Sequence, residues 1–194
     1  EVRHASSRFS YQYLPADSFY ATALEVIDGY SPADLFLNTV ATDITEDENY
    51  VSITTNQGRI KARFVFDGRN DPKHHSQLGC LLQHYVGQRI RTHTPVFDPS
   101  TVTLMDFDVP QHHGITFLYV LPFSEKEALV EPTVLSRAPL KPSAYTKLIR
   151  DYLRVRFEVQ HNDVLFEEQG IIPMTTQLSP VKMPTRLIPI GTAA

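Results

Sequence analysis

Residues 115–135 read ITFLYVLPFSEKEALVEPTVL, two apolar runs joined by a polar segment that contains Pro122 and Ser124. Short apolar runs bounded by turn-forming residues are typical of strands in a sheet. Similar runs occupy residues 80–90 and 101–109, and Pro, Gly, Asp or Ser separates each run from the next. Because strands joined by short connections usually pair in opposite directions, this part of the chain predicts an antiparallel sheet.

The residues before this sheet predict a helix, a strand and a hairpin. Residues 17–29 begin with Asp-Ser, carry apolar side chains at helical spacing and end with Asp-Gly, so they predict a capped helix. A strand is expected over residues 35–41, and residues 50–66 read as a hairpin that turns at 56–58. The polar, His-rich residues 71–79 read as a loop.

The residues after the sheet predict one more helix and two strands. Pro142 opens a segment in which Tyr145, Ile149 and Tyr152 lie on one face of a helix. Residues 164–173 and 187–190 return to strand-like patterns. Strands grouped together with a few separate helices predict an α+β fold.

The composition narrows the class of protein. With 42% hydrophobic and 21% charged residues and a net charge of -4, the 194-residue chain is typical of globular proteins. No window approaches the roughly 20 apolar residues that cross a bilayer, so no spanning segment is expected. Basic residues are not in excess, which argues against a nucleic-acid partner. The single cysteine, Cys80, excludes an internal disulfide and favours a reducing compartment.

Two histidine pairs, His74-His75 and His112-His113, are the first candidates for chemistry. Adjacent residues on a strand point to opposite faces, and neither pair has the helical spacing of a zinc site. We therefore expect surface histidines and no metal site.

Acidic residues are the stronger candidates. Asp106 and Asp108 are two positions apart, so on a strand they would share a face and could hold a proton between them. Glu131 lies within the apolar run 128–133, where burial would raise the pKa of its carboxyl toward neutrality. On the residues alone, a catalytic acid and a buried structural glutamate are equally good readings of Glu131.

Several ordered blocks resemble a known family. They are Gln83-His-Tyr-Val-Gly87, Pro95-Val-Phe-Asp-Pro99, Leu104-Met-Asp-Phe107, Phe117-Leu-Tyr-Val-Leu-Pro-Phe-Ser124, Ala128-Leu-Val-Glu131, Gly170-Ile-Ile-Pro-Met174 and Ile190-Gly-Thr-Ala193. In this order they resemble the flavin-dependent lycopene beta-cyclases of carotenoid synthesis. The resemblance is good from about Asp67 to Ala194 and looser over the first 66 residues.

The resemblance implies a fold and an activity. The fold would be an antiparallel substrate-domain sheet with a few helices, part of a glutathione-reductase-like FAD-binding fold. The activity would be a non-redox isomerisation: an acid protonates a terminal double bond of lycopene, the cation closes a beta-ring, and a proton leaves elsewhere. Reduced FAD would be the cofactor of the intact protein, acting electrostatically or in proton transfer.

The resemblance also implies site residues. Glu131 matches the family's acidic strand residue and is expected to act as acid or base, with Asp106 as its proton partner or orienter. Gly191 and Thr192 resemble a segment that contacts the flavin. A cation needs a dry pocket with aromatic faces, and five aromatic residues are expected to line the carotenoid: Phe97, Phe107, Phe117, Tyr119 and Phe123.

The chain departs from the family in two places. It contains no Gly-x-Gly-x-x-Gly fingerprint, so these residues alone are not expected to grip the FAD pyrophosphate or to be active. Pro132 follows Glu131 where relatives often carry another residue, and its missing N–H predicts an edge strand or a bulge. The expected division is a partial FAD-domain segment at 1–79, the carotenoid-binding sheet at 80–160 and strands that return to the FAD domain at 161–194.

Two other functions stay open: an FAD-dependent monooxygenase or oxidoreductase with the same sheet, and a carotenoid-binding module without catalysis. Neither would require Glu131. Since lycopene resides in lipid, a cytoplasmic protein in peripheral contact with the membrane is expected.

Overall fold

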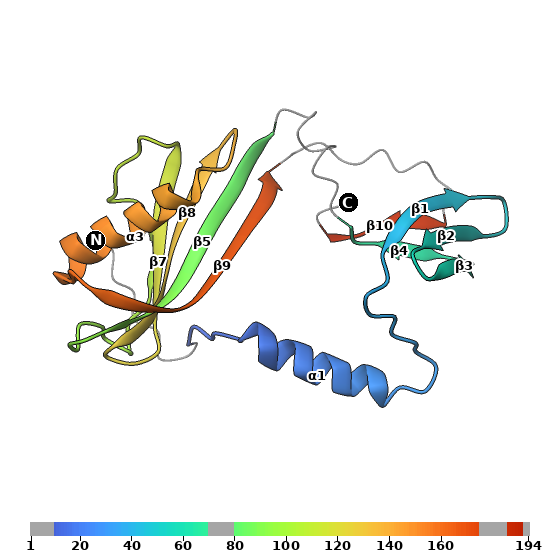
Figure 1. The fold of residues 1–194 in the computed structure, drawn as a ribbon, viewed down its shortest axis with the longest axis horizontal. Helices are drawn as coiled ribbons and strands as arrows, with labels where there is room; N and C mark the ends of the chain where they lie inside the picture. Colours follow the sequence, from blue (N-terminus) through green and yellow to red (C-terminus); the bar gives the residue numbers. More distant parts are fainter. Residues whose placement is uncertain (1–9, 70–79, 175–185, 192–194) are drawn as a thin grey trace. The chain divides into compact units, whose positions relative to one another are not determined.

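The computed structural model describes residues 10–69, 80–174 and 186–191 (Figure 1). Contacts divide the chain into two compact units, Glu1–Val65 with Pro184–Leu187, and Phe66–Met183 with Ile188–Ala194. Helices and antiparallel strands occur together, and strands predominate. The α+β class is therefore confirmed.

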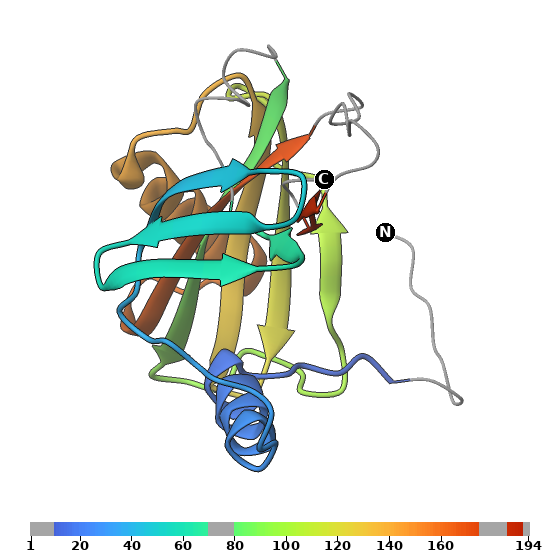
Figure 2. The same cartoon turned by 90° about the vertical axis from the view of Figure 1, so that its right-hand side faces the viewer.

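The first unit contains a helix and a small sheet. Helix α1 (Ala16–Asp28) lies where a helix was expected, and none of its residues is buried. The expected Asp-Ser cap is wrong, because Pro15 is the N-cap residue and makes no side-chain hydrogen bond to the helix. Strands β1 (Ala41–Glu46), β2 (Val51–Thr55) and β3 (Gly58–Ala62) form an antiparallel sheet in the order β1-β2-β3, visible in blue to green in Figure 2. Strands β2 and β3 are the predicted hairpin.

The strand expected over residues 35–41 is wrong except at its last residue, because β1 begins at Ala41. Asn38 has a positive φ of 54°, a left-handed conformation that interrupts an extended strand. The Asn56 side chain accepts a hydrogen bond from the Val40 N–H at 2.8 Å and donates one to the Asn38 carbonyl at 3.1 Å. These side-chain bonds satisfy the backbone where a strand ladder would otherwise do so.

A short two-stranded sheet joins β4 (Val65–Asp67) to β10 (Leu187–Pro189). The hairpin strand expected to continue to residue 66 therefore stops at Ala62 and resumes as β4. The loop predicted at 71–79 lies outside the described residues.

The second unit is built on a five-stranded antiparallel sheet with the order β6-β7-β8-β5-β9. Its strands are β5 (Leu81–Thr92), β6 (Thr103–Asp106), β7 (Ile115–Pro122), β8 (Glu127–Ser136) and β9 (Asn162–Met174). The apolar runs identified in the sequence are these strands, so the predicted antiparallel sheet is confirmed.

Helix α3 (Pro142–Phe157) packs on one face of this sheet (Figure 1). Pro142 occupies the first turn, where its missing N–H costs nothing. The helix ends at Glu158, which has a left-handed φ of 57°. The predicted apolar face is confirmed, with four of its side chains buried: Tyr145, Ile149, Tyr152 and Leu153.

The strands divide their side chains between two faces. Val120 of β7 and Val130 of β8 are register partners and belong to the core under α3. Tyr119 and Glu131, one position away on each strand, are also partners and therefore point to the opposite face. We call this the far face, because it is turned away from α3.

Pro132 lies in a central strand, so the expected edge or bulge is wrong. It pairs with Leu118 of β7, and β8 has β5 on its other side. Strands β5 and β8 pair Tyr85 with Thr133 and Gln88 with Val130 in the same register. The two positions between these pairs on each strand are not paired. Pro132 has no N–H to donate to this ladder, which accounts for the interruption.

Candidate active site

Glu131 is the central acid of the far face. Its Oε1 accepts a hydrogen bond from the Thr133 hydroxyl at 3.2 Å, and its register partner on β7 is Tyr119. Burial raises the pKa of the Glu131 carboxyl, the Thr133 hydroxyl opposes this rise, and the negative charge of Glu168 adds to it. The raised pKa expected from the apolar neighbours is thus present.

A glycine makes room for this carboxyl. A Cβ placed on Gly87 of β5 would lie 3.1 Å from Glu131 Oε2, closer than most real Cβ contacts. The same Cβ would lie 3.2 Å from Cγ and 3.3 Å from Oε1 of Glu168, which is the register partner of Gly87 on β9. Two carboxylates from strands on either side of β5 therefore converge over Gly87.

Sequence reasoning missed Glu168. The signal was Gly87 in the middle of a strand, because such a glycine often marks a close approach by another group. The identity of that group depends on the pairing of β5 with β9, which are far apart in the sequence.

Tyr85 fills a second glycine gap beside the first. A Cβ on Gly170 of β9 would lie 2.6 Å from Tyr85 Cε1, so only glycine leaves room for the ring. Burial raises the pKa of the Tyr85 hydroxyl, and the charges of Glu131 and Glu168 add to the rise. Tyr85 therefore lies with the two carboxylates on the far face.

Three of the five predicted aromatic residues form a row on this face. The ring centroids of Phe107 and Phe117 are 5.2 Å apart, and those of Phe117 and Tyr119 are 5.5 Å apart. Tyr119 is the register partner of Glu131, so one end of the row of rings lies beside the Glu131 side chain. Phe117 is buried and Phe107 is half-exposed.

The other two predicted aromatic residues lie elsewhere. Phe97 is 5% exposed and belongs to the core under α3, where its ring centroid is 5.0 Å from that of Phe157. Phe123 follows β7, and its ring lies 5.0 Å from the Arg89 guanidinium carbon. The structure does not bring either of them to Glu131.

Asp106 points toward α3 and not toward Glu131. Its Oδ2 accepts a hydrogen bond from the Tyr152 hydroxyl at 2.8 Å and lies 3.4 Å from the Arg156 guanidinium. Strand β6 ends at Asp106, so the period of two does not extend to Asp108, yet Asp108 also pairs with Arg156 at 2.6 Å. A direct catalytic role for Asp106 stays a prediction.

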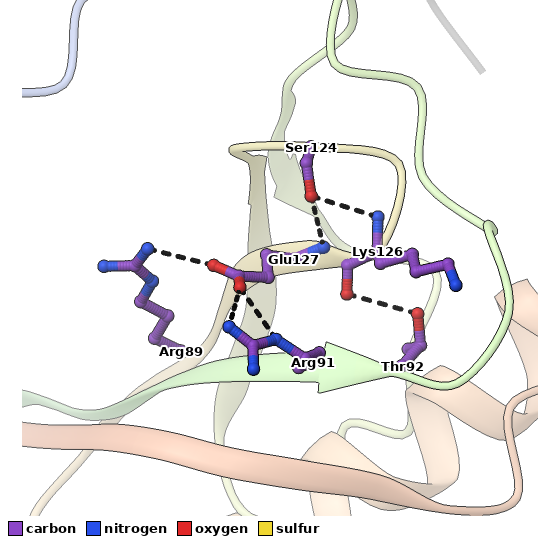
Figure 3. Close-up of polar contacts among 6 residues, drawn as sticks. All are labelled: Arg89, Arg91, Thr92, Ser124, Lys126 and Glu127. Atoms are coloured by element: carbon purple, nitrogen blue, oxygen red, sulfur yellow. Dashed lines mark hydrogen bonds and ion pairs between the residues drawn. The ribbon is translucent and has the colours of Figure 1, made fainter.

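An ion-pair cluster lies at one end of the far face (Figure 3). The carboxylate of Glu127 on β8 accepts hydrogen bonds from two arginines of β5, from the guanidinium of Arg89 at 2.9 Å and from Nε of Arg91 at 2.8 Å. Hydrogen bonds from the two guanidinium groups, of which that of Arg91 has the larger effect, hold the pKa of Glu127 below its usual range. The Ser124 hydroxyl oxygen accepts the Glu127 N–H at 3.0 Å and so fixes the turn that carries this residue. Two arginines from β5 therefore bind one glutamate of β8 at this end of the face.

His84 belongs to a chain of hydrogen bonds on the α3 side. The Ser136 hydroxyl donates to the Ala138 carbonyl at 2.7 Å, so its oxygen accepts from His84 Nε2 at 2.9 Å. His84 Nδ1 accepts a hydrogen bond from the Tyr145 hydroxyl at 2.6 Å. The oxygen of the same hydroxyl accepts a hydrogen bond from the Leu140 N–H at 3.2 Å. Burial lowers the pKa of His84, which favours the neutral imidazole and these donor and acceptor roles.

Among the residues that the structure describes, no group of three or more His, Cys, Asp and Glu side chains could hold a metal ion. His112 and His113 are exposed, whereas His74 and His75 lie outside the described part of the chain. No helix in the described ranges has both the length and the apolar character needed to cross a bilayer.

The described residues fit only a small part of a flavin site. Gly191 follows β10 with a φ of 63°, and among the described residues other than its chain neighbours no atom lies within 4 Å of the place where its Cβ would be. A backbone without a side chain at this point leaves room for a ligand to approach. Thr192, the other predicted contact, lies outside the described residues.

A family model described as "Lycopene cyclase protein" matches residues 5–194. The lycopene beta-cyclase of Pantoea ananas is 32% identical over 153 residues, which cover 78% of this chain and 38% of that protein. The lycopene beta-cyclase of Paracoccus sp. is 32% identical over 167 residues, which cover 79% of this chain and 40% of that protein. The chain thus spans less than half the length of these curated relatives.

Solved structures show a flavoprotein fold. A geranylgeranyl bacteriochlorophyll reductase-like protein from Thermoplasma acidophilum superposes with a TM-score of 0.65 at 14% identity, over 91% of this chain and 47% of that one. A flavoprotein/dehydrogenase from Cytophaga hutchinsonii has a TM-score of 0.60 at 15% identity, over 95% of this chain and 48% of that one. At these identities the likeness concerns the fold alone.

Proposed function

The chain belongs to the lycopene cyclase family, and from this premise we propose that it supplies the acid-bearing substrate sheet of an enzyme that closes the linear ends of lycopene into beta-rings. The single observation that carries the proposal is the placement of Glu131. Its partly buried carboxyl has a raised pKa and lies beside Tyr119, at the end of the row of aromatic rings.

The reaction begins and ends with proton transfer. Glu131, whose protonated form is favoured because burial raises the pKa of its carboxyl, donates a proton to a terminal carbon–carbon double bond. The resulting carbocation is attacked by an internal double bond, which closes the ring. A neighbouring carbon then returns a proton to the Glu131 carboxylate, which restores the acid, so that substrate and product have the same atoms and no electrons are consumed.

The far face suits a cationic intermediate. The rings of Phe117 and Tyr119 present π-electron density to a cation, and Phe117 is almost inaccessible to water. Exclusion of water matters because water would otherwise capture the cation. Phe107 extends the apolar row toward the exposed edge of the sheet, where a long carotenoid chain would continue.

The complete protein would require reduced FAD, which supplies an anionic ring that stabilises positive charge. Gly191, which has no side chain, would allow close approach of the cofactor to the backbone. Lycopene resides in lipid, so we also propose that the complete protein is cytoplasmic and contacts the membrane peripherally.

The test uses the full-length protein with lycopene and reduced FAD. Glu131→Gln keeps the shape of the side chain and removes the acid, so we expect cyclic product to fall by at least about a hundredfold. Product is measured by chromatography, and folding is checked by circular dichroism. Glu125→Gln, in the exposed turn before β8, is the matched control and should keep full activity.

Unchanged cyclisation by Glu131→Gln would contradict the proposal. Net oxidation of the flavin during turnover would instead identify a redox enzyme with the same fold. Binding of lycopene without any product, in the unaltered protein, would identify a carotenoid-binding module.

A further inference from the structure

The pair of carboxylates over Gly87 is a feature that the action of Glu131 alone does not explain. Glu131 comes from β8 and Glu168 from β9, and these strands flank β5 in the sheet. Both side chains approach the place where Gly87 lacks a Cβ, at 3.1 Å for Glu131 Oε2 and 3.3 Å for Glu168 Oε1. A sheet that only needed stability would keep like charges apart on neighbouring strands.

The other groups around Glu131 do not neutralise this pair. Arg89, two residues beyond Gly87 on β5, directs its guanidinium to Glu127 at 2.9 Å. Thr133, on the same strand as Glu131, bears no charge and donates a hydrogen bond. The titratable and charged groups that face Glu131 from the packed strands are Tyr119 from β7, Tyr85 and Arg89 from β5, and Glu168 from β9.

We propose that Glu168 is a positioning residue of the cyclisation reaction, whose negative charge, held across Gly87, keeps Glu131 protonated until the substrate arrives. This inference rests on the proposed function of Glu131 as the acid. The charge of Glu168 disfavours ionisation of Glu131, because the ionised form would place a second negative charge on the same side of Gly87. Glu168 thus acts through Glu131 and does not itself need to touch the substrate.

The arrangement also has a steric requirement. A methyl group at position 87 would lie 3.1–3.3 Å from atoms of both side chains, so each would have to move by a few tenths of an ångström. Tyr85, packed in the neighbouring gap over Gly170, lies on the same face as the pair. The mid-strand glycines therefore allow the carboxyl pair and the Tyr85 ring to lie against the sheet.

The test is the pH profile of kcat/KM for cyclisation by the full-length protein with lycopene and reduced FAD. Because the active form of Glu131 is protonated, activity falls as pH rises above its pKa. Glu168→Gln removes the repelling charge, so the alkaline limb should move to lower pH by roughly one unit. Above that limb, activity should be about tenfold lower than in the unaltered protein at the same pH.

Two variants control for other effects. Glu168→Asp keeps the negative charge and should restore at least part of the original profile. Asp163→Asn removes a negative charge from the same strand, five residues away, and should leave the profile unchanged. An unchanged alkaline limb in Glu168→Gln, or an equal shift in Asp163→Asn, would overturn the inference.

A second measurement does not depend on turnover. The infrared band of a protonated carboxyl, assigned to Glu131 by its loss in Glu131→Gln, should titrate at lower pH in Glu168→Gln. If Glu131→Gln remains fully active, the proposed function fails whatever Glu168 does. If Glu131→Gln is inactive but the band and the limb do not move in Glu168→Gln, only the role of Glu168 fails.

Discussion

The two faces of the five-stranded sheet differ in how the polar side chains on them are hydrogen-bonded. On the α3 side, the buried His84 and the carboxylate of Asp106 each have hydrogen-bond partners from the helix. On the far face, Glu131 has the Thr133 hydroxyl as a partner and a second carboxylate as a neighbour. Satisfied polar groups stabilise a fold, whereas an acid with a repelling neighbour is costly and is typical of a functional site. We expect the α3 side to contribute more to stability, and we propose that the far face carries the chemistry.

The largest expected effect concerns packing. Leu118→Ala removes a side chain that is 1% exposed in the core under α3, so it should lower the free energy of unfolding by about 2–5 kcal/mol. Phe107→Ala, on the far face, removes a ring that is 49% exposed and should cost clearly less. Denaturant unfolding of the full-length protein measures both. Equal losses would break the assignment of stability to the α3 side.

A smaller effect is expected from removing one hydroxyl on each face. Tyr152→Phe leaves the Asp106 carboxylate without its 2.8 Å donor and should cost about 1–3 kcal/mol of unfolding free energy. Tyr85→Phe, on the far face, should cost less than half as much. The same denaturant titrations measure the difference. A larger loss for Tyr85→Phe would show that the far face also depends on satisfied polar groups for its stability.

The smallest expected effect is a pH dependence that belongs to the α3 side. Burial lowers the pKa of His84 from 6.5, so on acidification the unfolded chain takes up the proton first. The stability from neutral His84 is therefore complete above pH 6.5 and is lost as the pH falls toward its folded-state pKa. Thermal midpoints across this range measure the slope, which His84→Asn should remove.

The exposed His112 is the control for this slope, and His112→Gln should leave it unchanged. If His84→Asn kept the original slope, the pH dependence would belong to other groups.

The sequence predicted the sheet well because its signal is local. Apolar runs between turn residues, such as 115–121 and 128–135, became β7 and β8. The strand predicted over residues 35–41 was wrong because Asn38 adopts a left-handed conformation, which the pattern of apolar residues does not indicate.

The candidate site was predictable only in part. Glu131 could be identified from its apolar neighbours and from the family resemblance, whereas Glu168 required the long-range pairing of β5 with β9. Phe97 was expected to line the carotenoid, but it packs in the core under α3. It lies in a loop, where the alternation of apolar and polar residues does not indicate which face of the sheet a side chain joins.

Gly87 has a consequence for how related sequences vary. The space it leaves is shared by side chains from two other strands, so positions 87, 131 and 168 are coupled. In a relative with alanine at position 87, both acids would have to shift slightly, or one of them would be shorter or replaced. Substitution at these three positions should therefore be correlated across the family, although they are separated by tens of residues along the chain.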